Sequence, residues 1–166
     1  MIDISFYKEF YFKEIERKNV LDSKVSLPIL VLSILVSIHV FILSKGLTGN
    51  FLLLSMVLST INGLAFFVAL FFLTKSYSNL FYSHWYKELP VMNDILTYEK
   101  KLEKEGLKNK SEILEEYLKR ELADCASENF NLNKKRTENL AKCKQWMFIN
   151  ILFTAFLVIV YAVFLL

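Results

Sequence analysis

Three stretches of this chain contain no charged side chain, and each is long enough to cross a lipid bilayer. Lys24 and Lys45 bracket the first stretch of twenty residues, the second runs from 46 to 74, and the third from 145 to 166. A helix rises about 1.5 Å per residue, so roughly twenty residues span a hydrocarbon core of roughly 30 Å. Because lipid offers the backbone no hydrogen-bond partner, the helix is the natural form of each stretch. The sequence therefore predicts an all-α integral membrane protein with three transmembrane helices.

The charges that these stretches lack are concentrated elsewhere and define the parts of the chain. The predicted parts are an N-terminal amphipathic helix, a transmembrane helical hairpin, a cytoplasmic helical region and a C-terminal transmembrane helix, at 1–24, 25–74, 75–144 and 145–166. Neither Gly nor Pro follows Gly106, so a helix from Ser111 could run unbroken into the last span. A break at the Asn-rich residues 129–133 is the alternative.

The first 24 residues place apolar side chains at helical spacing. Ile4, Tyr7, Tyr11 and Ile15 lie three or four residues apart, as on one face of a helix. Such a helix could lie in the headgroup layer with its aromatic rings at the boundary. It could equally pack on the protein's own soluble helices, and the pattern leaves both roles open.

The distribution of Lys and Arg predicts how the chain is oriented. Residues 1–24 and 75–144 together hold nineteen of them, whereas the link between the first two spans holds only Lys45. Cytoplasmic loops are enriched in Lys and Arg. We therefore expect a multi-pass protein of the cell inner membrane, with its N-terminus and the region 75–144 in the cytoplasm.

Aromatic side chains are expected where the spans meet the membrane surface. Trp and Tyr are enriched at the membrane–water boundary because their rings are apolar at one end and polar at the other. The candidates for this boundary are Tyr77, Trp85 and Trp146, with Phe81 and Tyr82 beside the first two.

The chain offers little material for catalysis. It contains two histidines and two cysteines, and Cys125 and Cys143 lie eighteen residues apart. It has no glycine-rich phosphate loop, no zinc-protease motif and no serine-nucleophile motif. We therefore expect no catalytic residue, no cofactor, no metal site and no enzymatic activity. The net charge of +3 gives no basic footprint for nucleic acid.

The polar residues inside the spans are the most informative, because polar side chains are costly in lipid and turn toward protein or water. In the first span we expect three of them to be buried: Ser33, Ser37 and His39. In the other two spans the candidates for pore lining or helix contact are Ser55, Ser59, Asn62, Gly63, Asn150 and Thr154. Small residues in such a row allow close packing of helices. The same residues therefore fit two roles, the lining of a pore between subunits and plain helix packing.

Two groups of residues resemble a known kind of membrane protein. The first group, before the hairpin, is Tyr11, Glu14, Arg17, Leu21, Ser23, Ser26, Leu27 and Pro28. The second, after it, is Asn129, Asn133, Arg136 and Leu140. In both, the chain resembles small uncharacterised bacterial multi-span membrane proteins that are similar to anti-phage defence membrane effectors. The resemblance implies damage to the inner membrane when a sensor is triggered. It covers about half of the chain and carries over no binding residue, and the third span departs from the two-span form of such effectors.

Together these features predict a homo-oligomeric inner-membrane effector. It would form a pore, such as an ion channel, or perturb the membrane on a cytoplasmic signal, with antiviral defence as the setting that the resemblance implies. The expected partners are the lipid bilayer, further copies of the chain and a cytoplasmic sensor or defence protein, and nucleic acid is not among them. The alternative is a non-conducting membrane anchor or adaptor whose helical region docks a partner protein.

Overall fold

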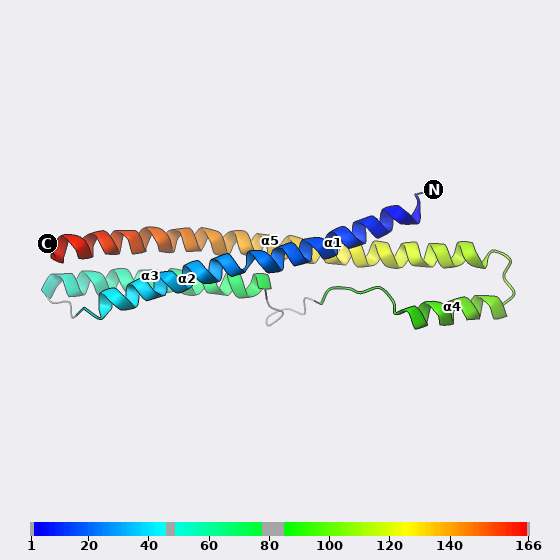
Figure 1. Ribbon diagram of the computed structural model, residues 1–166, viewed down its shortest axis with the longest axis horizontal. Helices are drawn as coiled ribbons and strands as arrows, with labels where there is room; N and C mark the ends of the chain where they lie inside the picture. The colour runs from blue at the N-terminus through cyan, green and yellow to red at the C-terminus, as the bar shows by residue number, and fades with distance from the viewer. Residues whose placement is uncertain (1, 46–48, 78–84, 166) are drawn as a thin grey trace. The chain divides into compact units, whose positions relative to one another are not determined.

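The computed structural model describes residues 2–45, 49–77 and 85–165, and its helices are drawn in Figure 1. In chain order these helices are α1 (Ile4–Lys24), α2 (Ser26–Leu43), α3 (Gly49–Tyr77), α4 (Met92–Lys104) and α5 (Lys110–Leu165). The described residues include no β-strand, so the prediction of an all-α fold is confirmed.

Three helical segments have the length and the apolar composition that a membrane span requires. They are Ile4–Leu43, Phe51–Tyr77 and Lys110–Val163. The prediction of a membrane protein with three transmembrane helices is thereby confirmed. The expected turn between the first two spans falls partly on residues 46–48, which lie outside the described residues, as do Phe81 and Tyr82 of the aromatic group.

The last helix is continuous across the Asn-rich stretch. α5 is a single α-helix from Lys110 to Leu165, so the helix does not break at residues 129–133. Before it, α4 starts just after Pro90 and is closed by Gly106, whose φ of 68° lies in the left-handed region that commonly terminates helices.

The chain divides into two compact units, and each is described by itself below. Unit 1 comprises Met1–Val20 and His84–Lys134, and unit 2 comprises Leu21–Ser83 and Lys135–Leu166. Unit 2 therefore contains most of the apolar stretches, whereas unit 1 contains most of the charged ones.

In unit 1, α1 packs on the first part of α5. The buried core consists of Tyr11, Leu122, Cys125 and Ala126, and the half-buried side chains against it are Ile4, Tyr7, Ile15 and Leu89. The apolar stripe of residues 1–24 thus contacts the protein's own helices. On other parts of α1, Phe6, Phe10 and Phe12 are exposed.

In unit 2, the core is formed by side chains from α2, α3 and α5 together with the end of α1. One group of buried residues is Leu21, Val25, Leu32, Ala69, Leu73, Leu140 and Cys143, and a second is Ile42, Leu58 and Leu157. The polar side chains described next lie on the same three helices.

Candidate functional site

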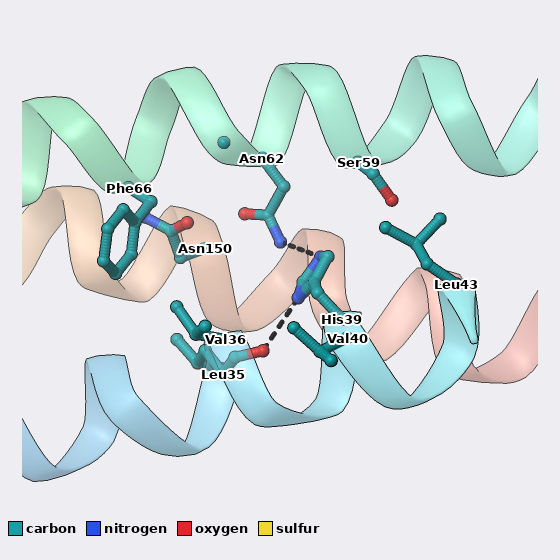
Figure 2. A pocket seen from close by; sticks show the side chains of 10 residues that line it. Leu35, Val36, His39, Val40, Leu43, Ser59, Asn62, Phe66 and Asn150 are labelled. Atoms are coloured by element: carbon teal, nitrogen blue, oxygen red, sulfur yellow. Dashed lines mark hydrogen bonds between the residues drawn. The ribbon is translucent and has the colours of Figure 1, made fainter.

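A cluster of polar side chains joins the three long helices of unit 2. His39 lies on α2, Asn62 on α3 and Thr154 on α5, and Asn62 is only 3% exposed. The Asn62 Nδ2 atom lies 2.6 Å from His39 Nε2 and 2.9 Å from Thr154 Oγ1. Asn62 therefore ties α3 to both neighbouring helices, and Figure 2 shows its bond to His39.

One assignment of hydrogens satisfies each of these contacts with the Asn62 amide as placed. Thr154 Oγ1 donates to Asn150 O at 2.8 Å, so it accepts its other bond from Asn62 Nδ2. His39 Nδ1 lies 2.8 Å from Leu35 O, and a carbonyl oxygen only accepts, so Nδ1 carries the proton. His39 Nε2 then accepts from Asn62 Nδ2. In this arrangement His39 is neutral, with its hydrogen on Nδ1.

Two buried polar atoms beside the cluster have no hydrogen-bond partner among the described residues. They are Ser59 Oγ and Asn62 Oδ1. Leaving a buried polar atom unpaired costs about 1–3 kcal/mol. If the amide nitrogen and oxygen of Asn62 were exchanged, His39 would need a hydrogen on both ring nitrogens, and Thr154 would have to donate to Asn62 instead of to Asn150 O.

The residues that carry these two atoms line a pocket between α2, α3 and α5. Its volume is about 180 Å³. Most of its other lining is apolar: Leu35, Val36, Val40, Leu43, Gly63 and Phe66. In Figure 2 Asn62 extends from α3 toward α2, with its nitrogen toward His39 and its oxygen on the side of Phe66 and Asn150. The pocket is thus an apolar space with polar groups on one wall.

Four of the six candidates from the second and third spans meet at this pocket. Ser59, Asn62, Gly63 and Asn150 line it, and Thr154 joins them through its hydrogen bond to Asn62. Ser55 stands apart, because it is fully buried and donates to Leu52 O of its own helix.

The first span contributes one of its three polar candidates. His39 is half-buried in the cluster, whereas Ser33 and Ser37 are exposed on α2 instead of buried as expected. Their hydroxyls donate to carbonyl oxygens four residues earlier, those of Ile29 and Ser33. A serine satisfied by its own helix needs no partner helix, which explains why sequence reasoning misjudged their burial.

The three aromatic candidates for the membrane surface differ in exposure. In unit 2, Tyr77 is exposed at the end of α3, and Trp146 is half-buried against the core. In unit 1, Trp85 is 80% exposed.

A second polar arrangement, in unit 1, holds the extended segment 85–91 on α5. Asn129 Oδ1 accepts from the Lys87 backbone N–H at 2.9 Å, and Asn129 Nδ2 donates to Lys87 O at 3.1 Å. The Cys125 thiol donates to Glu88 O at 3.5 Å. The Asn129 amide therefore forms the same pair of hydrogen bonds with the Lys87 backbone that a neighbouring β-strand would form.

Asn133, one helical turn further along α5, connects the same segment to α1. Asn133 is fully buried, and its Nδ2 donates to the backbone oxygen of Glu14 at 2.8 Å and to Glu14 Oε2 at 2.9 Å. The Tyr86 hydroxyl donates to Asn133 Oδ1 at 2.5 Å. The Glu14 carboxylate, which is nearly buried, also pairs with Arg17 at 3.8 Å.

In unit 2, Arg136 of α5 joins the ends of α1 and α3. Its side chain is nearly buried, its Nε donates to Ser76 O in the last turn of α3 at 2.7 Å, and its Nη2 pairs with Asp22 of α1 at 2.5 Å. A cation that binds the unpaired carbonyls at a helix C-terminus is a common way to cap it.

Sequence reasoning gave Asn129, Asn133 and Arg136 no role beyond the resemblance. These residues lie four and three positions apart, which places them on one polar face of a continuous helix. This spacing could have predicted that they share a role. Several residues of the two resembling groups contact one another, among them Glu14 with Asn133, and Leu21 with Leu140 in one core.

No three His, Cys, Asp or Glu side chains in the described ranges lie close enough to hold a metal ion. The chain matches no protein-family model, no curated protein and no solved structure. Its candidate sites are therefore defined by their geometry alone: the polar cluster and pocket of unit 2, and the asparagine contacts of unit 1.

Proposed function

We propose that this protein is a homo-oligomeric membrane effector. It rests as a closed three-helix bundle and perturbs the inner membrane when unit 1 receives a cytoplasmic signal. The observation that carries the proposal is the hydrogen-bonded cluster of His39, Asn62 and Thr154 inside three predominantly apolar spans. A plain anchor needs no polar group within its spans, and such groups are costly in lipid and typical of functional sites.

The cluster suits a bundle with a closed and an open arrangement. Hydrogen bonds between helices in a membrane contribute about 0.6 kcal/mol each on average, so these contacts hold the bundle closed only weakly. Side chains on the outer surface, such as Leu53 and Phe67, are exposed and apolar and suit contact with lipid. In an assembly of several copies, the cluster residues are the ones suited to face water and line an opening.

Antiviral defence is the setting that the resemblance implies for this activity. In that setting the signal would come from a sensor or another defence protein in the cytoplasm. Unit 1 is the natural receiver, because it holds most of the charged residues outside the spans.

Release of a trapped dye from liposomes tests the proposal. Once the products of the neighbouring genes supply the cytoplasmic signal, the wild-type protein should release the dye, and Asn62→Leu should reduce the release because the opening loses its polar lining. Thr60→Val is the matched control, since Thr60 is exposed on the same helix and its hydroxyl donates to Met56 O of that helix. If the wild type releases no dye from liposomes and causes no leakage in cells that also express the neighbouring genes, the proposal is wrong.

The second candidate function is a membrane adaptor that does not conduct. It is favoured by the exposed aromatic surface of α1, where the Phe6 and Phe10 rings lie 6.0 Å apart and are about half exposed. Exposed apolar groups of this kind often mark protein–protein contacts. An adaptor would retain a stoichiometric partner after its spans are exchanged for unrelated ones, and it would lose the partner when Phe6 and Phe10 are replaced by Ser.

A further inference from the structure

We propose that the pocket between α2, α3 and α5 binds a small amphiphilic alcohol. The ligand would have an apolar body and one hydroxyl group that donates a hydrogen bond to Asn62 Oδ1. This inference does not depend on pore formation, because it concerns what occupies the bundle and not what passes through it.

The ligand must be a donor, because the unpaired atom of Asn62 is an acceptor. Both hydrogens of Asn62 Nδ2 are used, one toward His39 Nε2 and one toward Thr154 Oγ1. The Oδ1 atom is buried without a partner in a side chain that is 3% exposed. A ligand hydroxyl supplies the hydrogen that Oδ1 lacks.

The rest of the ligand must be apolar and small. Leu35, Val36 and Phe66 are among the side chains that line the remainder of the pocket. An apolar cavity of about 150 Å³ in another protein binds benzene. A pocket of about 180 Å³ is therefore large enough for a ring or short alkyl chain together with one hydroxyl oxygen.

Gly63 has no side chain to fill the pocket, so a larger residue at this position can be used to close it. A Cβ atom at this position would meet no neighbouring atom within 4 Å. Gly63→Leu therefore places a side chain beside the pocket without a clash at its first atom, and leucine favours the helix more than glycine does. Val36→Phe enlarges a side chain on the opposite helix and provides an independent way to fill the pocket.

The test uses two diazirine-bearing photoprobes, a hexanol and its methyl ether, with the full chain in phosphatidylcholine nanodiscs. Phosphatidylcholine has no hydrogen-bond donor, so the lipid cannot satisfy Asn62 Oδ1. We expect saturable labelling of the pocket residues by the alcohol. Unlabelled 1-hexanol should compete at a concentration at least tenfold lower than its methyl ether. Labelling of the exposed Phe67 on α3 measures simple partition into lipid and should be similar for both probes.

Gly63→Leu and Val36→Phe should each abolish the saturable labelling and leave that of Phe67 unchanged. Equal competition by alcohol and ether would overturn the proposal, as would pocket labelling that survives both variants or that never saturates in the wild type. Nanodiscs that contain phosphatidylglycerol, whose headgroup has hydroxyl donors, separate the two sources of ligand. Displacement of the probe by this lipid assigns the site to a lipid hydroxyl, and its absence assigns the site to a free alcohol. Both results support the proposal.

Discussion

Replacing Asn129 by alanine should release the extended segment 85–91 from α5. Asn129 is 1% exposed and makes two hydrogen bonds to the backbone of Lys87, at 2.9 and 3.1 Å. A hydrogen bond inside a protein contributes about 0.5–1.5 kcal/mol net. The loss of two therefore lowers the free energy of opening this segment by about 1–3 kcal/mol, which corresponds to roughly a 5- to 150-fold increase in the open population.

Hydrogen exchange followed by mass spectrometry measures this opening directly. Peptides that contain the Lys87 amide should exchange faster by this factor in Asn129→Ala, provided that the segment opens locally. Asn129→Asp should also exchange faster, because it keeps an acceptor for the Lys87 N–H but places a second oxygen against Lys87 O. Asn131→Ala is the control, since Asn131 is exposed on the same helix. Unchanged exchange in Asn129→Ala would refute the argument that this side chain holds the segment.

Three further predictions concern other contacts. In a double-mutant cycle, Asn62→Leu and Thr154→Val should show a coupling of about 0.6 kcal/mol in unfolding from bicelles, and no coupling would contradict their hydrogen bond. Gly106→Ala should destabilise the turn after α4 by about 1–2 kcal/mol because its φ is 68°, and faster limited proteolysis there would report it. The hydrogen bond from Lys110 holds the pKa of the Glu103 carboxyl below its ordinary value. The contribution of this contact to folding stability is therefore present at neutral pH and is lost as the pH falls through that lowered pKa. NMR titration of Glu103 should therefore give an ordinary pKa in Lys110→Ala. A pKa of Glu103 that stays as low as in the wild type would contradict the assignment of this shift to Lys110.

The spans could be predicted from sequence because one physical rule decides them. Charged side chains are costly in lipid, so their absence from three long stretches was enough to place three apolar helices. The stripe at Ile4, Tyr7, Tyr11 and Ile15 was also visible, because helical spacing brings these side chains to one face.

The sequence did not reveal which polar groups form hydrogen bonds with one another. Asn129 binds the backbone of Lys87, and a contact to backbone atoms requires no particular residue type that a sequence could show. Ser33 and Ser37 could not be told from serines that face a partner helix, because a serine hydroxyl is satisfied equally well by its own helix. The Asn-rich stretch 129–133 was ambiguous because Asn favours turns as well as buried contacts.

The central claim is that the helices of one chain close around the cluster of His39, Asn62 and Thr154. Solid-state ¹⁵N NMR in bilayers tests it most directly, with His84→Gln to leave one histidine and with labelled chains diluted into unlabelled ones. We predict a neutral His39 with its hydrogen on Nδ1, and a through-space correlation between His39 Nε2 and Asn62 Nδ2 that survives dilution. A hydrogen on Nε2, or a correlation that disappears on dilution, would contradict the account.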